Sequence, residues 1–325
     1  MLVIVCPGQG AQSPGMLTPW LELPPVEACL DRAAGLTGVD LIAHGTTSDA
    51  ETIRDTAVAQ PLLVATALAS LRVVLDADAD TRWPALTAGR IDATAGHSVG
   101  EIAAAAVSGL LTEADALRLV GVRGAAMARA AAAAGPTGMS AVLGGDPDEV
   151  LSTLADLGLV PANVNGGGQV VAAGPMDALA RLAAAPPTRA RVIALQVAGA
   201  FHTQVMSPAV AELQDAASGV VPSTPGVALL GNADGAVVTD AADGLARLVA
   251  QVARPVRWDL CAATLAGLGV TGLLELAPGG VLTGLARRTL PGVENVALKS
   301  PDDVDAARDL VRRHAGPPTG QETAP

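Results

Sequence analysis

The sequence predicts an α/β fold into which a smaller ferredoxin-like unit is inserted. Apolar runs of strand length alternate with helical segments through residues 1–135, and six shorter elements then follow in the order β-α-β-β-α-β. The chain has 325 residues, of which 50% are hydrophobic and 16% are charged. A chain of this size and composition can bury a large core, so we expect one large domain and a second small one.

The first part of the chain alternates strands and helices. The apolar run at 2–6 predicts a buried strand. Thr112 and the acidic residues after it predict the start of a helix that runs to about Ala134, where Gly135-Pro136 breaks it. Between these we expect a helix over 61–75, a strand over 91–95 and a helix from about Val99.

The inserted unit follows this break. Asp146-Pro147-Asp148-Glu149 combines an N-cap, a proline at the first helical position and a carboxylate in the first turn, which is typical of a helix start. The expected elements are strands at 139–143, 159–164, 169–173 and 191–197 and helices at 146–156 and 175–185.

The domain boundaries follow from this order. Further strands are expected at 227–230, 272–276 and 293–297. We therefore expect residues 1–135 and 198–325 to form a discontinuous core domain and residues 136–197 to form the inserted subdomain. Residues 316–325 are polar and contain proline, which predicts a disordered tail.

The net charge of −12 and the pI near 4.7 disfavour binding to nucleic acid or to anionic membranes. The three cysteines are isolated and lack metal-ligand spacing, so neither a disulfide nor a metal site is expected. The N-terminus lacks the pattern of a signal peptide, and the longest charge-free run, 192–211, is too polar to cross a bilayer. We expect a soluble, cytoplasmic protein.

A G-x-S-x-G match, GHSVGE at 96–101, lies between an expected strand and an expected helix. Its glycines would let the backbone turn tightly and lift the hydroxyl of Ser98, as in a nucleophile elbow; the alternative is a plain strand-to-helix corner. The N–H of Val99 would then point to the space where an oxyanion forms. The glycine-rich loop at 7–12 would bring a second N–H, from Gln9, unless it is a phosphate-binding or merely tight turn.

A serine hydroxyl needs a base at neutral pH, and four histidines are available. His314 lies in the tail and His44 lies in a polar loop. His97 comes directly before the serine, so its ring should point away from the hydroxyl. His202, in GAFHT, remains, although a lone loop histidine is often structural. Because 192–211 contains no carboxylate, we expect a Ser98–His202 dyad whose ring is oriented by a neutral acceptor.

Arg123 lies on one helical row with Leu119 and Met127, at i, i+4 spacing. Its guanidinium therefore emerges among apolar and small side chains. One expected partner is an internal Asp or Glu. The other is a substrate carboxylate held by the bidentate fork.

Seven segments follow one another in a specific order along the chain. They are GQGAQ, GHSVGE, VRGAAM, NVNGGGQVVAAG, GAFHT, QVARPVRW and ELAPGGVLTGL. Together they resemble the malonyl-CoA:acyl carrier protein transacylases and the acyltransferase domains of polyketide and fatty acid synthases. The resemblance extends to about Ser300 and implies an α/β-hydrolase-like core with a mostly parallel sheet.

The resemblance also implies roles for residues of this chain. Ser98 would take the malonyl group as an ester, and His202 would act as base and then as acid. Arg123 would bind the malonyl carboxylate, and the backbone carbonyl of Gln251 would orient the histidine. The peptide N–H groups of two residues would form the oxyanion hole: Gln9 and Val99.

The acyl pocket would include Phe201 and Met127, and Phe201 would favour malonyl over methylmalonyl groups by crowding an α-methyl branch. No permanently bound cofactor is implied: the partners are malonyl-CoA and the phosphopantetheine of acyl carrier protein, in fatty acid synthesis. The alternatives are an acyltransferase of a polyketide pathway or of malonate decarboxylase, and a serine esterase or thioesterase. Because carrier proteins are usually acidic, a basic docking patch is needed, with these candidates: Arg181, Arg189, Arg191, Arg287 and Arg288.

Overall fold

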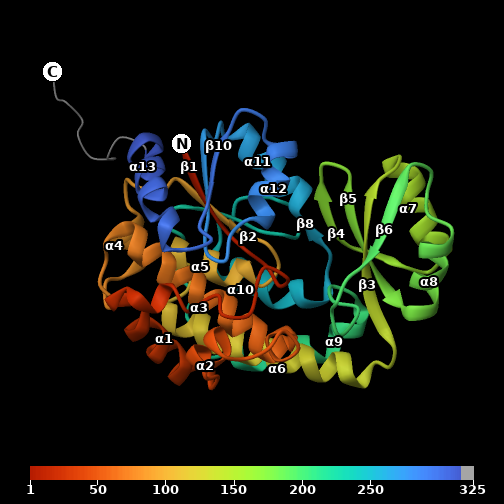
Figure 1. The fold of residues 1–325 in the computed structure, drawn as a ribbon, viewed down its shortest axis with the longest axis horizontal. Coiled ribbons are helices and arrows are strands. Elements are labelled where there is room, and N and C mark those ends of the chain that lie inside the picture. Colours follow the sequence, from red (N-terminus) through yellow and green to blue (C-terminus); the bar gives the residue numbers. More distant parts are fainter. Residues whose placement is uncertain (316–325) are drawn as a thin grey trace.

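The computed structural model describes residues 1–315, so the expected disorder of 316–325 lies outside the described residues. It is a mixed α/β structure with two five-stranded sheets. The first sheet is parallel throughout, in the order β10-β9-β1-β2-β7 (Figure 1). Its strands are β1 (Leu2–Cys6), β2 (Ala93–Gly96), β7 (Ala228–Leu230), β9 (Gly272–Glu275) and β10 (Glu294–Ala297). A parallel sheet in the core is therefore confirmed.

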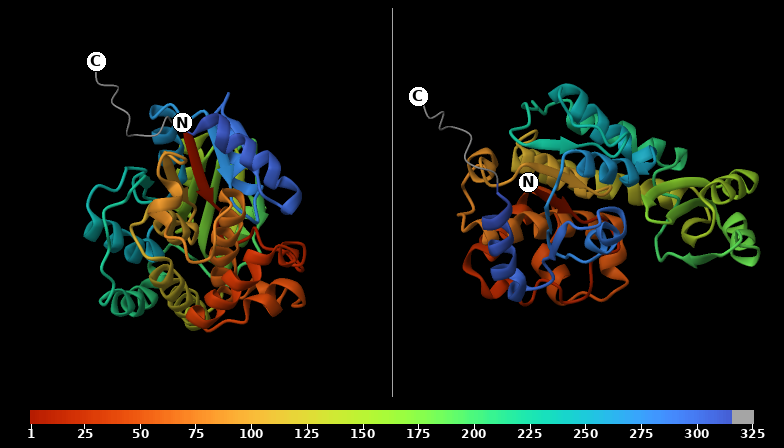
Figure 2. Two further views of the ribbon diagram at one scale, coloured as in Figure 1. Left: turned by 90° about the vertical axis from the view of Figure 1, so that its left-hand side faces the viewer. Right: turned by 90° about the horizontal axis from the view of Figure 1, so that it is seen from above.

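Helices cover both faces of this sheet (Figure 2). The strand β1 is buried throughout, and its residues alternate between the two faces. Leu2 and Ile4 pack into the larger cluster, which includes residues of α3, α5 and α13, whereas Val3 and Val5 pack against α11 and α12. The bounds of these helices are α3 (Thr56–Leu75), α5 (Gly100–Ser108), α11 (Trp258–Gly267), α12 (Val281–Thr289) and α13 (Val304–His314).

The helix α3 begins five residues earlier than the prediction of 61–75, because Asp55 caps it by accepting from the N–H of Ala57. It is long and apolar enough to cross a membrane by length and composition, but 94% of its most apolar window is buried inside the structure. It is a core helix. The remaining α-helices outside residues 136–197 are α1 (Pro24–Thr37), α2 (Leu41–Thr46), α4 (Trp83–Thr87), α6 (Glu113–Ala133), α9 (Ser207–Ala217) and α10 (Ala241–Ala250).

The second sheet lies to one side of the first and has the order β6-β3-β5-β4-β8 (Figure 1). Its first four strands pair antiparallel. They are β3 (Thr137–Gly144), β4 (Val160–Gly166), β5 (Gln169–Pro175) and β6 (Ala190–Ala194), with α7 (Pro147–Asp156) and α8 (Met176–Ala184) between them. The six elements occur in the expected order, but the last strand stops at Ala194, three residues short of the prediction.

The fifth strand of this sheet, β8 (Val256–Arg257), comes from the C-terminal part of the chain and pairs in parallel with β4. The second sheet is therefore not built from residues 136–197 alone. The predicted caps are present: Thr112 accepts from the N–H of Asp115, and Asp146 accepts from the N–H groups of Asp148 and Glu149.

Candidate active site

Ser98 lies on a tight turn between β2 and α5. Its φ of 54° is in the left-handed region, which non-glycine residues rarely adopt. The chain folds back closely here: a Cβ on Gly96 would lie 1.9 Å from the carbonyl carbon of Gly100, and one on Gly100 would lie 2.2 Å from the main-chain oxygen of Cys6. Both positions therefore require glycine, and the predicted turn is present.

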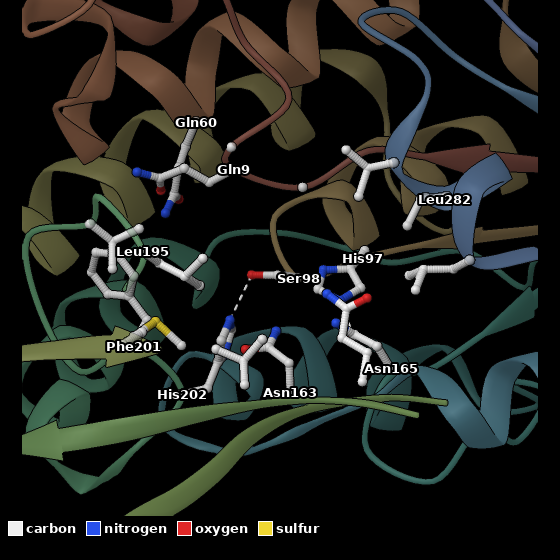
Figure 3. A pocket seen from close by; sticks show the side chains of 18 of the residues that line it. Gln9, Gln60, His97, Ser98, Asn163, Asn165, Leu195, Phe201, His202 and Leu282 are labelled. Atoms are coloured by element: carbon white, nitrogen blue, oxygen red, sulfur yellow. Dashed lines mark hydrogen bonds between the residues drawn. The ribbon is translucent and has the colours of Figure 1, made fainter. Parts of the chain in front are cut away.

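The hydroxyl of Ser98 meets the imidazole of His202, which lies 104 residues away in the chain (Figure 3). The Oγ–Nε2 distance is 2.7 Å. On the other side of the ring, Nδ1 lies 3.1 Å from the main-chain oxygen of Gln251. The side-chain Nε2 of Gln251, which only donates, lies 3.1 Å from the same Nδ1. A proton on Nδ1 bonds to the main-chain oxygen and leaves the ring Nε2 of His202 to accept from the serine. The neutral orienting acceptor expected from the sequence is thus a backbone carbonyl.

The environment of His202 keeps its ring neutral. Burial, reinforced by the charge of Arg123, lowers the pKa of His202 to about 3. The ring of His97 has a different partner: its Nε2 lies 2.8 Å from Oδ1 of Asn165. His44 contacts Ser48, and His314 contacts Thr271 and Glu294.

Arg123, on α6, is buried, and its guanidinium lies beside the dyad. Its Nη1 donates to Oε1 of Gln60 at 2.7 Å, and its Nη2 donates to Oε1 of Gln251 at 3.0 Å. The same Nη2 lies 3.4 Å from Oγ of Ser98. Arg123 forms no ion pair within residues 1–315, so the alternative of an internal carboxylate partner is not realised.

The guanidinium nevertheless carries its charge at neutral pH. Burial lowers the pKa of Arg123 to about 10, and Coulomb attraction to Glu101, whose own pKa burial raises to about 8, opposes this shift. Two neutral amide side chains orient the fork without cancelling its charge. A buried, oriented cation with no anionic partner is suited to a carboxylate-bearing substrate.

Two peptide N–H groups near the serine donate no hydrogen bond to protein atoms within residues 1–315: those of Gln9 and Val99. The N–H of Ser98 itself is taken, since it donates to Oδ1 of Asn232 at 2.8 Å. Gln9 lines the cavity in front of the serine, and its side chain is held by Arg54 and Thr56.

The cavity has a volume of about 210 Å³ and lies between the second sheet and the loops that follow β1 and β2. Figure 3 shows Gln9 and Gln60 on one side and Asn163 and Asn165, from β4, on the other. The two expected pocket residues both line it and are both buried: Phe201 and Met127. Arg288 lies beside a residue of the cavity lining, since its Nη2 donates to Oε1 of Gln169 at 3.2 Å.

Sequence reasoning missed several polar residues here. Asn163 and Asn165 have the i, i+2 spacing that puts both side chains on one face of a strand, so the pattern was available. Gln60 was also visible as a polar residue in an apolar helix. Asn232 carries no such signal, because it lies in an ordinary loop after β7.

Comparisons with known proteins agree with this geometry. A family model described as "Acyl transferase domain" matches residues 3–297, and the chain belongs to this family. The malonyl CoA-acyl carrier protein transacylase of Mycobacterium tuberculosis is 49% identical over 310 residues, which is 95% of this chain and 100% of that protein. The transacylase of the same name from Salmonella typhimurium is 35% identical, over 93% of this chain and 97% of that protein.

Solved structures of transacylases are also similar to this chain. The crystal structure of MCAT from Mycobacterium tuberculosis matches with a TM-score of 0.86 at 48% identity and covers 95% of this chain and 99% of that chain. A structure described as a type II PKS acyl-carrier protein in complex with its malonyl-transacylase matches with a TM-score of 0.84 at 30% identity, over 95% of this chain and 99% of that chain.

Proposed function

We propose that this chain transfers the malonyl group from malonyl-CoA to the phosphopantetheine thiol of acyl carrier protein, through an ester on Ser98. The observation that supports this assignment is the convergence of three groups at one hydroxyl. Oγ of Ser98 lies 2.7 Å from Nε2 of His202 and 3.4 Å from Nη2 of Arg123. A nucleophile, a base and a cation for the free carboxylate are thus together.

In the first half-reaction, Ser98 attacks the malonyl thioester carbon while Nε2 of His202 takes the hydroxyl proton. The oxyanion accepts from the N–H groups of Val99 and Gln9, and each donor lowers the barrier by about 3 kcal/mol. The tetrahedral intermediate collapses, the C–S bond breaks, and the imidazolium gives its proton to the CoA thiolate. A positioned base of this kind contributes about 10²–10⁴-fold in rate.

In the second half-reaction, the carrier's phosphopantetheine thiol occupies the place that CoA left. His202 takes the thiol proton, the thiolate attacks the malonyl ester, and the serine oxygen recovers the proton from the imidazolium. Arg123 holds the malonyl carboxylate through both steps. The exchange of one thioester for another requires no resident cofactor beyond these groups, and we propose none.

We propose that fatty acid synthesis is the pathway served and that the enzyme works in the cytoplasm. The curated relatives at 49% and 35% identity carry the transacylase name over nearly their full lengths, which supports this assignment. A polyketide carrier protein is the second candidate, because the same residues would serve it and one structural neighbour is described with such a carrier. An esterase is disfavoured, since hydrolysis makes no use of Arg123.

We propose that residues 1–135 and 198–315, the described part of the expected 198–325, form an α/β-hydrolase-like core and that 136–197 form a ferredoxin-like subdomain. The parallel sheet and the β6-β3-β5-β4 order with two connecting helices support these assignments. The cavity would then be the acyl-transfer cleft, with Arg288, which bonds to the lining residue Gln169, as part of the carrier docking surface.

The test is to incubate the protein with radiolabelled malonyl-CoA and follow acid-stable label on the protein and its passage to holo acyl carrier protein. We expect label on Ser98, loss of label in Ser98→Ala, and transfer to the carrier thiol. Label that appears mainly as free malonate would favour a hydrolase. Label that persists in Ser98→Ala would refute the assignment of the nucleophile.

A further inference from the structure

Asn232 lies where the strand before the serine leaves the parallel sheet. It follows β7, which pairs with β2 up to Ala95 and Leu230. Beyond this pair β2 continues for one residue and then turns into the Ser98 loop. Asn232 has 0% exposure, so its polar groups must be satisfied inside the protein.

The side-chain amide of Asn232 bonds to both ends of this turn. Its Oδ1 accepts from the N–H of Ser98 at 2.8 Å, and its Nδ2 donates to the main-chain oxygen of Gly96 at 2.7 Å. A peptide group of a neighbouring parallel strand offers the same acceptor and donor. The side chain therefore extends the sheet's hydrogen bonding to a segment that has already left it.

The backbone of Asn232 is held as firmly as its side chain. Its N–H donates to Oε1 of Glu101 at 2.6 Å, and its main-chain oxygen accepts from the N–H of Arg257 at 2.8 Å. Glu101 is itself buried, and its N–H donates to the main-chain oxygen of Ser98 at 3.0 Å. Ser98, Asn232 and Glu101 thus form a closed ring of hydrogen bonds.

This ring bears on the chemistry in two ways. The φ of 54° at Ser98 costs free energy, and the bond to Asn232 satisfies the N–H that this conformation presents. The same bond occupies the N–H of Ser98, so that the N–H of Val99 remains as the free donor at this end of the turn. The contact is between residues 134 positions apart.

We propose that Asn232 is a positioning residue for the reaction: its amide holds the Ser98 turn so that the hydroxyl faces His202 and the Val99 N–H faces the oxyanion. This inference rests on the proposed role of Ser98 as nucleophile. Glu101 supports it by fixing the N–H of Asn232. Neither residue lines the cavity in front of Ser98.

The test uses two readouts. Rapid-quench mass spectrometry gives the rate constant for malonyl-enzyme formation and the KM for malonyl-CoA. A fluorophosphonate probe, which has no carboxylate for Arg123 to bind, reports Ser98 reactivity without the malonyl-carboxylate contact. For Asn232→Ala we expect both rate constants to fall by on the order of 10²-fold, with KM unchanged. Rate constants are compared, because an unfolded fraction lowers only the amplitude.

The matched control is Asn295→Ala. Asn295 lies on β10 of the same sheet, and its side chain donates to the main-chain oxygen of Val293 at 2.7 Å. This variant should keep both rate constants. Glu101→Leu, which unpairs the N–H of Asn232, should lower them, and Glu101→Gln, which retains an acceptor oxygen, should restore most of that loss.

Wild-type rate constants in Asn232→Ala, or equal losses in Asn295→Ala, would overturn the proposal. A raised KM with an unchanged rate constant would instead make Asn232 a residue of substrate binding and overturn it as well. If Ser98 reacts with the probe in an Asn232-dependent manner but no malonyl group reaches the carrier, the positioning role stands and the proposed transfer function fails.

Discussion

The guanidinium of Arg123 donates to the side-chain oxygen of Gln251 at 3.0 Å. The main-chain oxygen of the same glutamine lies 3.1 Å from Nδ1 of His202. One residue therefore orients the cation with its side chain and the base with its backbone. Because both acceptors are neutral, the charge of Arg123 remains available to an anionic substrate, and it also opposes protonation of the nearby imidazole.

Substitution of Arg123 by Ala should change substrate choice more than general reactivity. We expect malonyl transfer to fall by about 10²-fold, the scale set by a lost charge-assisted pair, with acetyl transfer spared or improved. The measurement is kcat/KM for malonyl-CoA and acetyl-CoA. The control is Arg129→Ala on the same helix, an exposed arginine paired with Glu212. Equal losses for both substrates would argue against a carboxylate clamp.

The pH dependence of Ser98 reactivity should show a base of unusually low pKa. Since the pKa of His202 is lowered from 6.5 to about 3, the acid limb of probe labelling should lie well below pH 6.5. Arg123→Ala removes one cause of the shift, so the limb should move to higher pH. As pH falls from 6.5 towards 3, His202 is protonated in the unfolded chain but still neutral in the folded protein. The free energy of unfolding therefore decreases across that window. An acid limb of probe labelling near pH 6.5 that does not move in Arg123→Ala would contradict the lowered pKa of His202.

Phe201 should limit the size of the acyl group. Its ring is buried in the cavity wall, so Phe201→Ala should raise the ratio of methylmalonyl to malonyl transfer by about tenfold or more. The truncation should also cost about 3–5 kcal/mol of stability. Leu213→Ala, buried in α9 outside the cavity lining, is the control for stability loss without a change in the ratio. An unchanged ratio in Phe201→Ala would remove Phe201 from the pocket assignment.

Arg288 should matter for the carrier protein and not for acylation. Charge reversal in Arg288→Glu should raise the KM for holo acyl carrier protein, more strongly at low salt. Acylation by malonyl-N-acetylcysteamine, which carries no phosphate, should be unchanged. Arg312→Glu on α13 is the control, because Arg312 is exposed and pairs with Asp309, which does not line the cavity. Equal effects of the two reversals would indicate net charge and not local docking.

The glycines of the Ser98 turn should be required for stability. A Cβ on Gly96 would lie 1.9 Å from the backbone of Gly100, so Gly96→Ala should cost about 3 kcal/mol or more in urea unfolding. Gly35, on α1, has no atom within 4 Å of the place that a Cβ would take, and Gly35→Ala should stabilise the protein by about 0.5–1 kcal/mol. A Gly96→Ala protein of wild-type stability would show that the turn relaxes easily.

Local features of the fold and of the site could be predicted where neighbours in the chain decide them. The turn at Ser98, the cap at Thr112 and the start of α7 at Asp146 depend on residues within a few positions. The same reasoning missed Asn232, whose bond to Ser98 spans 134 residues. It also left the partner of Arg123 open, because helical spacing places a guanidinium among apolar residues without showing what faces it.

The sequence by itself determined the α/β alternation, the order of the elements in the second sheet and the glycine turn that carries the serine, since periodicity and short-range sterics act along the chain. Only the tertiary structure decided that Ser98 and His202 meet at 2.7 Å, that two glutamines hold Arg123 without neutralising it, and that β8 joins the second sheet. Burial and Coulomb interactions depend on distances in space, and packing sets those distances between residues 63 to 128 positions apart in the chain.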